Sequence, residues 1–247
     1  MVLKMKEITS VNNEYIKYLL KLNDKKNRYK EKKFIIEGYH LINEAYSAGL
    51  LQEILTVKKI DEYSDIPQIK VSEQIIQKLS STVNPQGIVG ICNMKSNKEI
   101  LGTRILLLDN INDPGNMGTL IRSSLGFDID TIIISEDCVD IYNNKTLRAS
   151  QGSIFHSNII VKDLNEAIRE LKNNGIKVIG TSLSSSINLK ECKLKNNYAI
   201  LLGNEANGVR EELLKLSDLN VKIEMNSKLE SLNVAVAGSI IMYYFNN

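Results

Sequence analysis

The sequence predicts an α/β protein of two domains, the second built on a parallel sheet. Between residues 104 and 223, five nearly continuous apolar runs alternate with helical patterns. Such runs are typical of parallel strands that are buried on both faces. Upstream, shorter β-rich runs and helical patterns alternate as far as the polar stretch NMKSNKE at residues 93–99, which we expect to be a linker. The expected domains are therefore residues 1–95 and 96–247.

The first domain is expected to begin with a capped helix. Asn12 or Asn13 can cap it, because the apolar residues Ile16, Leu19 and Leu22 follow at helical spacing. Strands are expected at residues 34–36, 53–57, 69–71 and 88–92, and further helices at 39–48 and 73–79.

In the second domain the strands are expected at residues 104–108, 131–134, 177–180, 198–202 and 221–223. The helices between them are expected at 117–125, 164–173, 208–216 and 231–245. The last of these includes the most apolar segment, residues 234–245. It is too short to cross a bilayer, which takes about 20 residues, so a buried helix is expected.

The composition is that of an ordinary globular protein, with 43% apolar and 24% charged residues in 247. The three cysteines, Cys92, Cys138 and Cys192, are widely spaced, and they form neither a disulfide framework nor a metal-ligand set. His40 and His156 have no partner at metal-ligand spacing, and no metal is expected. The first ten residues, MVLKMKEITS, hold no apolar run of signal-peptide length. These features favour a reduced, cytoplasmic protein.

Positive charge is concentrated between residues 17 and 33. This segment contains eight basic residues and only two acidic ones, Asp24 and Glu31. A segment of this kind suits the phosphates of a nucleic acid, although a solvated helix end would look the same. Tyr18 and Tyr29 lie in the same stretch and could stack on bases. The candidate RNA-binding residues here are Lys25, Lys26, Arg28 and Lys30.

Three segments place polar residues where an apolar strand ends, which is where open α/β sheets bind ligands. The first, residues 108–122, reads LDNINDPGNMGTLIR and contains Asn116 and Arg122. Its glycines give only GxxG, so it lacks the dinucleotide fingerprint of an oxidoreductase. Arg122 is expected one turn into the following helix, directed toward whatever the loop holds.

The second segment, residues 201–210, reads LLGNEANGVR. A phosphate loop would need Lys and Ser or Thr after its second glycine, and this chain has Val209 and Arg210. Gly203 can instead bring main chain close to a ligand. Glu205 follows in the loop, and the next helix is expected to begin at residue 207 or 208.

The third segment, residues 223–237, reads IEMNSKLESLNVAVA. A strand ends and a short loop follows. Ser231 is the expected N-cap of the final helix. Asn233 then lies in the first turn, where its side chain can reach neighbouring loops.

Together, the three segments resemble in order and spacing the motifs of the SpoU (TrmH-like) RNA 2′-O-ribose methyltransferases of the SPOUT superfamily. The segments RASQGS at residues 148–153 and GTS at 180–182 are also similar to family segments. Residues 11–38 and NPQG at 84–87 resemble the ribosomal-protein-like substrate-binding domain that precedes many of these enzymes. The resemblance therefore covers essentially the whole chain.

The resemblance implies a parallel-sheet domain with a deep trefoil (α/β) knot, behind a small N-terminal ribosomal-protein-like domain. It also implies a homodimer, S-adenosylmethionine as the cofactor, and RNA, mostly 23S ribosomal RNA, as the substrate, while some relatives act on tRNA. Arg148 joins the candidate RNA-binding residues. The implied cofactor-binding residues are Thr181, Leu202, Gly203, Gly208, Ile223, Met225 and Leu232.

For catalysis the resemblance implies Arg122, with Asn116, Glu205, Ser231 and Asn233 shaping the site. A guanidinium stays protonated in proteins and is a poor base, so we expect Arg122 to orient the ribose and stabilise its oxyanion. Glu224 departs from the family, which usually carries proline there. A non-catalytic RNA-binding factor with this fold is the remaining alternative.

Overall fold

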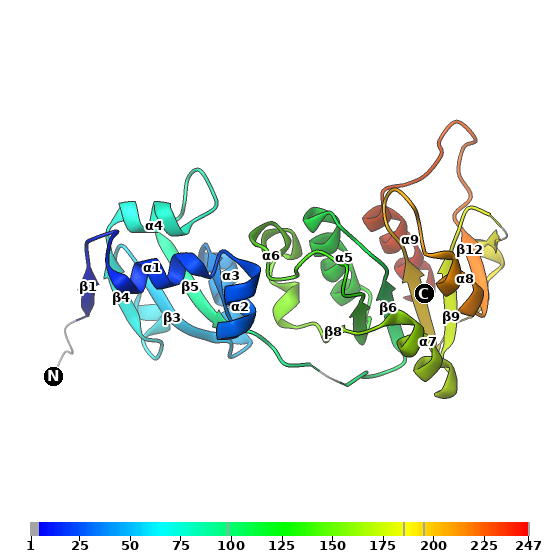
Figure 1. The fold of residues 1–247 in the computed structure, drawn as a ribbon, viewed down its shortest axis with the longest axis horizontal. Helices are drawn as coiled ribbons and strands as arrows, with labels where there is room; N and C mark the ends of the chain where they lie inside the picture. Colours follow the sequence, from blue (N-terminus) through cyan, green and yellow to red (C-terminus); the bar gives the residue numbers. More distant parts are fainter. Residues whose placement is uncertain (1–4, 98, 185, 195, 247) are drawn as a thin grey trace. The chain divides into compact units, whose positions relative to one another are not determined.

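The computed structural model describes residues 5–97, 99–184, 186–194 and 196–246, and it divides into two compact units (Figure 1). The N-terminal unit comprises Met1–Ser96 and Tyr142–Phe155, and the C-terminal unit comprises Asn97–Ile141 and His156–Asn247. Two parts of segments discussed above lie outside the described residues. They are residues 1–4 of the N-terminal segment MVLKMKEITS and Lys98 of the expected linker.

The grouping of residues 142–155 differs from the sequence-based division, which places them in the second domain. Their packing explains the difference. Tyr142 lies on Phe34 with ring centroids 4.5 Å apart, and Phe155 stacks on the same ring at 6.3 Å. Phe34 belongs to the first sheet, so this aromatic cluster draws the segment into the N-terminal unit.

The N-terminal unit is built on a five-stranded mixed sheet in the order β1-β4-β3-β5-β2. β4 runs parallel to β1 and β3, whereas β5 runs antiparallel to β3 and β2. Four of these strands lie where the sequence predicts them, and the three-residue β1 is too short to show a pattern. The strands are β1 (Lys6–Ile8), β2 (Lys33–Glu37), β3 (Leu51–Thr56), β4 (Gln68–Val71) and β5 (Ile88–Asn93).

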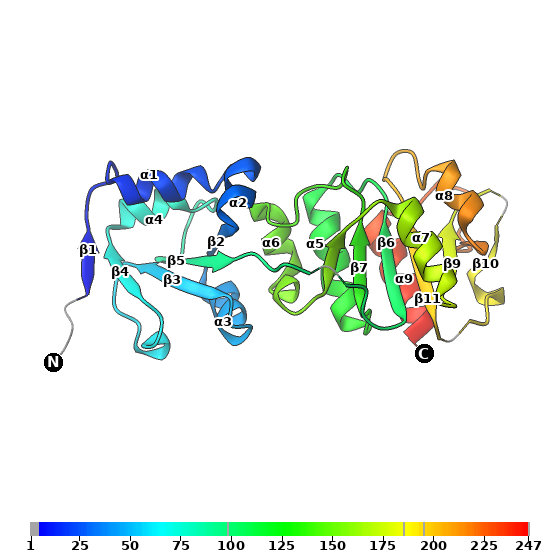
Figure 2. The same ribbon diagram turned by 60° about the horizontal axis from the view of Figure 1, so that its bottom comes forward.

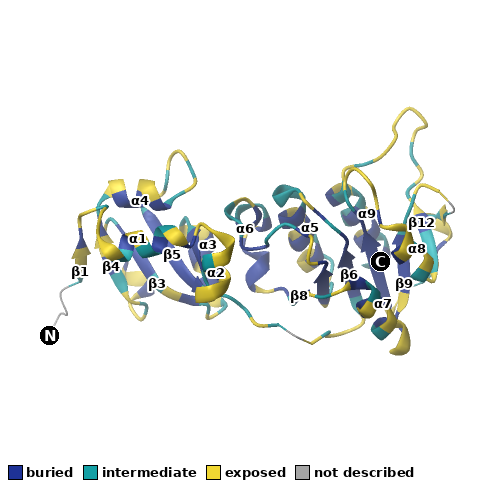
Figure 3. Ribbon diagram, viewed as in Figure 1, coloured by how far each residue is buried: buried dark blue, intermediate teal, exposed yellow. Residues whose placement is uncertain are grey.

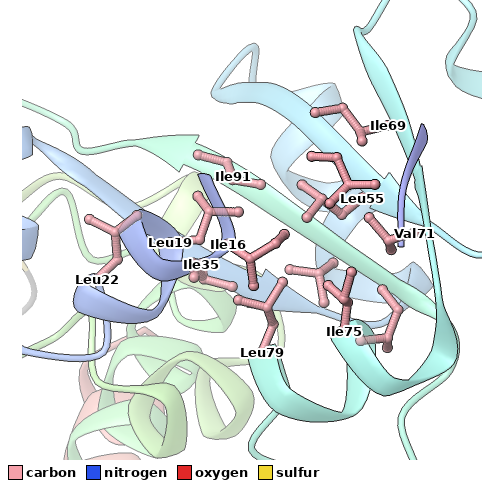
Figure 4. Packing of buried hydrophobic residues seen from close by; sticks show 13 residues of the cluster. Ile16, Leu19, Leu22, Ile35, Leu55, Ile69, Val71, Ile75, Leu79 and Ile91 are labelled. Atoms are coloured by element: carbon pink, nitrogen blue, oxygen red, sulfur yellow. The ribbon is translucent and has the colours of Figure 1, made fainter. Parts of the chain in front are cut away.

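Helices cover both faces of this sheet. Ile16 and Leu19 of α1 and Ile75 of α4 pack with Leu55 and Ile91 of the sheet on one face (Figure 4), and α3 lies against β2, β3 and β5 on the other. Asn13 caps α1 by accepting from the backbone N–H of Tyr15 at 2.9 Å, as the sequence predicts. The polar helix α2 carries no apolar period, so its sequence pattern does not predict a helix. The helices are α1 (Glu14–Lys21), α2 (Lys25–Glu31), α3 (Tyr39–Ser47), α4 (Glu73–Leu79) and α6 (Asn144–Ser150), with 3₁₀ turns η1 (Asp61–Tyr63) and η2 (Ser153–Phe155).

The C-terminal unit contains a seven-stranded sheet in the order β10-β12-β9-β11-β6-β7-β8, and every pairing in it is parallel. The predicted parallel α/β fold is therefore confirmed. All five predicted strands are present, and the short strands β8 and β10 are additional. The strands are β6 (Arg104–Leu108), β7 (Thr131–Ile134), β8 (Ile159–Val161), β9 (Lys177–Thr181), β10 (Ile187–Asn188), β11 (Tyr198–Leu202) and β12 (Leu219–Lys222).

The continuous apolar runs arise because both faces of this sheet are covered (Figures 2 and 3). Alternate residues such as Ile105 and Leu107 of β6 pack with the helices α7 and α8. On the other face, α9 approaches α5 and β11 so closely that a Cβ on Gly238 would lie 2.6 Å from Leu120 and Leu202. The helices are α5 (Pro114–Gly126), α7 (Leu164–Asn173), α8 (Glu211–Leu216) and α9 (Val234–Asn246), with the 3₁₀ turn η3 (Leu189–Glu191).

Three helix starts differ from the predicted ones. α5 begins earlier, because Asp113 accepts from the N–H of Asn116 at 2.8 Å and Pro114 takes the first position. α8 begins only at Glu211, and α9 only at Val234. Among the described residues, no helix has the length and hydropathy needed to cross a membrane.

Candidate active site

A cavity of about 540 Å³ lies at the carboxyl ends of β9, β11 and β12. Because these strands are parallel, their ends meet at one edge of the sheet. The loop after β11, the loop after β12 and the first turns of α9 close the cavity. All seven residues that the sequence analysis assigns to the cofactor line it: Thr181, Leu202, Gly203, Gly208, Ile223, Met225 and Leu232.

The loop after β11, residues 203–210, forms one wall of this cavity. Asn204 and Gly208 exchange two backbone hydrogen bonds, of 3.0 and 2.8 Å, and these close the loop on itself. A Cβ on Gly203 would lie 2.1 Å from the backbone nitrogen of Val209, and Gly208 has a φ of +71°. The loop itself therefore requires a glycine at position 203, in addition to any close approach of a ligand.

A chain of side-chain hydrogen bonds joins the three motifs. Asn116 Nδ2 donates to Glu205 Oε1 at 2.9 Å, and Asn233 Nδ2 donates to Asn116 Oδ1 at 2.9 Å. These residues lie 89 and 117 positions apart in the sequence. Glu205 also lines the cavity, as does Ser231. The structure thus brings together four of the five predicted catalytic residues.

Asn233, and not Ser231, caps the final helix. Asn233 Oδ1 accepts from the backbone N–H groups of Ala235 at 2.9 Å and Val236 at 3.3 Å. Ser231 lies in the loop before the helix. Asn233 therefore links the helix start to Asn116 through one amide group, which donates on one side and accepts on the other.

Arg122 lies apart from this group. α5 begins at Pro114, so Arg122 is in the third turn of the helix and not one turn into it as predicted. Its side chain is exposed, and it is not among the residues that line the cavity. Unlike Glu205 and Ser231, Arg122 therefore does not contribute to the wall of the cavity.

An ion pair with a buried carboxylate lies beside the loop, and the sequence pattern does not predict it. Asp109, which directly follows β6, is fully buried and accepts from Arg210 Nε at 2.8 Å. This hydrogen bond raises the pKa of Arg210, against the effect of partial burial. Asn204 was also missed, and its Nδ2 donates to the carbonyl oxygen of Asn110 at 2.8 Å. The available signal in the sequence was an acidic residue placed directly after the apolar run at residues 105–108.

The basic segment separates into exposed and buried residues. Lys25, Lys26 and Lys30 are exposed on α2, and Lys25 Nζ lies 5.8 Å from the centre of the Tyr29 ring. Arg28, in contrast, is buried, and its guanidinium donates to the carbonyl oxygens of Leu22 and Asn23, each at 2.8 Å. Arg28 closes the end of α1, and the expectation that it binds RNA is wrong.

Arg148, the other candidate RNA-binding arginine, has protein partners of its own. Its guanidinium forms an ion pair with Glu37 at 3.1 Å and donates to the hydroxyl of Ser81. Ser81 donates to the same carboxylate from its backbone N–H and its hydroxyl, each at 2.9 Å. Arg148 is therefore a structural partner of Glu37 within the N-terminal unit, and its side chain stays partly exposed.

Glu224, which departs from the family pattern, has its own partners. Its Oε2 accepts from Asn188 Nδ2 at 3.1 Å and lies 3.5 Å from Lys190 Nζ. These contacts join the start of the loop after β12 to the β10 edge of the sheet. They restrain the loop here, as the rigid ring of a proline would restrain it in the family.

Two family models match the chain. The model of the SpoU rRNA Methylase family matches residues 103–243, and that of the MRM3-like substrate binding domain matches residues 13–90. The chain is 37% identical over 245 residues to the 23S rRNA (guanosine(2553)-2′-O)-methyltransferase RlmP of Bacillus subtilis, covering 97% of this chain and 99% of that protein.

Solved structures agree with these matches. The AdoMet-bound rRNA methyltransferase of Sinorhizobium meliloti superimposes with a TM-score of 0.90 at 26% identity, covering 98% of this chain and 97% of that one. The SpoU methyltransferase AviRb of Streptomyces viridochromogenes shares the fold, with a TM-score of 0.86 at 21% identity and coverage of 95% and 97%. The motifs, the cavity they enclose and these matches lead to one conclusion: the chain belongs to the SpoU rRNA methylase family of S-adenosylmethionine-dependent RNA methyltransferases.

Proposed function

We propose that the chain transfers a methyl group from S-adenosylmethionine to a ribose 2′-hydroxyl of 23S ribosomal RNA. The observation that carries the proposal is that seven residues from three separate segments, assigned from the family resemblance, line one cavity. The full-length similarity to RlmP supports the ribosomal substrate.

The cavity suits an adenosyl cofactor. Its volume of about 540 Å³ is that of a small-molecule site. Leu202, Ile223, Met225 and Leu232 supply apolar surface for a flat base, while the 203–210 loop supplies main-chain groups for its polar edge. When bound there, the cofactor supplies an activated methyl group on a sulfonium.

The protein's own part in the reaction is positioning. The Asn116, Glu205 and Asn233 chain fixes the loops at the mouth of the cavity, so the reacting groups meet in a defined geometry. Arg122 is exposed and outside the cavity. We therefore assign it to the RNA, where its permanent charge orients the ribose and its phosphate and stabilises the emerging oxyanion.

We also propose that the C-terminal chain forms the deep trefoil knot of the family and that the N-terminal unit is the ribosomal-protein-like RNA-binding domain. The course of the chain supports the knot: after β12, on the far side of β9, it returns to pack α9 against α5 and β11. The exposed lysines of α2 support RNA binding by the N-terminal unit, and cytoplasmic location follows from the ribosomal substrate.

A homodimer is the proposed assembly. α9 exposes Val236, Ile240 and Tyr243 at 49%, 39% and 60%, and their spacing of four and three residues places them on one side of the helix. An apolar stripe of this kind suits a self-complementary interface. Ile240→Lys is expected to convert a dimer to a monomer in analytical ultracentrifugation, and a wild-type monomer would contradict the assembly.

The function is tested with purified protein, tritium-labelled S-adenosylmethionine, and 23S ribosomal RNA and bulk tRNA isolated from cells that lack the gene. Label is expected in 23S RNA, at a nucleotide that then resists alkaline cleavage because its 2′-oxygen is methylated. Label in tRNA alone would overturn the ribosomal assignment. Binding of S-adenosylmethionine without transfer to any RNA would favour a non-catalytic RNA-binding factor.

A further inference from the structure

We propose that Asp109 is a positioning residue for cofactor binding, acting through Arg210 to hold the 203–210 loop in the shape that lines the cavity. The inference rests on the proposed S-adenosylmethionine site. Neither residue is among the motif residues assigned above. Arg210 is the last residue of the loop, and Asp109 contacts both of its ends.

The burial of Asp109 makes a partner necessary. Its side chain is fully buried, while that of Arg210 is 41% exposed. A buried carboxylate is costly unless it is paired and hydrogen-bonded. Arg210 supplies the pairing: its Nε and Nη2 lie 2.8 Å from Oδ1, and its backbone N–H donates to Oδ2 at 2.9 Å. Both carboxylate oxygens are therefore directed at a single residue of the loop.

Arg210 stands at the end of the loop. It is the last residue before α8 and occupies the N-cap position, where its own side chain makes no capping hydrogen bond. Asp109 accepts from its backbone N–H in place of a local cap. The carboxylate thus fixes both the main chain and the side chain at the point where the loop ends.

The start of the loop is held by the same short segment. The backbone N–H of Asp109 donates to the carbonyl oxygen of Leu202 at 2.9 Å, and Asn204 Nδ2 donates to the carbonyl oxygen of Asn110 at 2.8 Å. Residues 109 and 110 therefore hold both ends of the loop. Every residue between those ends, from 203 to 209, lines the cavity.

The Asp109–Arg210 pair also affects the position of Glu205, one of the predicted catalytic residues. Glu205 sits in this loop and accepts from Asn116. If the Asp109 carboxylate no longer holds Arg210, the loop can move away from β6. The main chain at Gly203 and the Glu205 carboxylate then move with it. A purely structural ion pair would lower stability without this selective effect.

The experiment measures the dissociation constant of S-adenosylmethionine by calorimetry, with no RNA present. Asp109→Asn and Arg210→Gln are each expected to raise it about tenfold, since each removes a charged hydrogen-bonding group. Arg210→Lys is expected to raise it only about threefold, because an ammonium keeps the charge but loses the two-nitrogen contact. This partial rescue is a readout that general destabilisation would not give.

Asp218→Asn is the matched control. Asp218 accepts from the backbone N–H of Val178 at 2.8 Å and lies 3.4 Å from Lys172 Nζ, at the opposite, amino end of β9. Its loss is expected to lower the melting temperature, as Asp109→Asn does, while cofactor affinity stays within twofold of the wild type.

Two results decide the matter. Folded Asp109→Asn and Arg210→Gln variants that bind S-adenosylmethionine like the wild type would overturn the inference. If Asp109→Asn does not fold, the comparison of Arg210→Gln with Arg210→Lys decides alone, and equal affinities would overturn it. A wild-type chain that fails to bind S-adenosylmethionine would instead overturn the proposed function.

Discussion

Asn116 and Glu205 meet through a single hydrogen bond of 2.9 Å, from Nδ2 to Oε1, across 89 residues of sequence. One lies in the first turn of α5 and the other in the loop after β11. Asn233 donates to the oxygen of the same Asn116 amide, so this one side chain joins the three motifs through two hydrogen bonds. A substitution at any of the three residues is therefore expected to act on all three motifs.

Glu205→Gln is expected to lower methyl transfer about tenfold or more. The substitution keeps the shape but removes the negative acceptor of the Asn116 bond, and hydrogen bonds to charged groups contribute about 1.5–3 kcal/mol. The rate constant in single-turnover assays measures the effect. Glu211→Gln, at an exposed carboxylate of α8 that pairs with Lys215, is the control and should keep wild-type rates. Equal transfer rates for both variants would show that the Glu205 charge has no role in methyl transfer.

Arg122→Ala is expected to abolish methyl transfer, by at least about 100-fold, while the dissociation constant of S-adenosylmethionine changes little. Transfer is expected to fall without a loss of cofactor affinity because Arg122 does not line the cavity. Calorimetry and transfer assays on the same preparation measure both quantities. Arg169→Ala, at an exposed arginine of α7, is the matched control. Full activity of Arg122→Ala would refute its assignment.

Replacing Lys25, Lys26 and Lys30 together by Ala is expected to weaken RNA binding and reduce its salt dependence. For each phosphate that the variant no longer neutralises, the slope of log K against log salt should fall by about 0.7–0.9. Filter binding over a range of salt concentrations measures the slope. Arg28→Ala should instead lower the free energy of unfolding by about 3 kcal/mol, because Arg28 holds the end of α1. An unchanged slope in the lysine variant would show that α2 does not contact RNA.

The stability of the N-terminal unit is expected to fall in acid through Glu37. Burial raises the pKa of Glu37, but the hydrogen bonds from Ser81 and the Arg148 guanidinium outweigh it, so the pKa is lowered overall. The contribution is therefore complete above the unfolded pKa of about 4.3 and is lost as the pH falls through the folded value. Urea unfolding at a series of pH values should show a shallower acid loss for Glu37→Gln. Glu73→Gln, at an exposed carboxylate of α4, should follow the wild type.

Gly203→Ala is expected to destabilise the C-terminal unit by about 3 kcal/mol and to weaken S-adenosylmethionine binding at least tenfold. The new Cβ would lie 2.1 Å from the backbone nitrogen of Val209, so the loop must shift. Thermal unfolding and calorimetry measure the two effects. Gly126→Ala, where a Cβ meets nothing within 4 Å, should be near neutral. A neutral Gly203→Ala would mean that the loop closes differently.

The C-terminal sheet could be predicted because its strands are buried on both faces, so each reads as a continuous apolar run; Ile105 to Leu108 is an example. Helix starts were harder. Ser231 is as good an N-cap as Asn233 in sequence, and only the folded chain shows that Asn233 accepts from the helix and also contacts Asn116. The buried role of Arg28 depends on main-chain carbonyl oxygens, and that of Asp109 depends on Arg210, which is remote in the sequence. A residue pattern shows neither kind of partner.

The packing of residues 142–155 with the N-terminal unit bears on how the protein could have been assembled in evolution. A gene fusion at the linker near residue 95 would have delivered two self-contained modules. Here Phe34 and Glu37 are completed by Tyr142, Phe155 and Arg148, which are encoded inside the catalytic half. A chimera that exchanges only residues 1–96 with a relative would separate these partners. An exchange of the N-terminal unit that preserves these contacts must therefore include residues 142–155 as well.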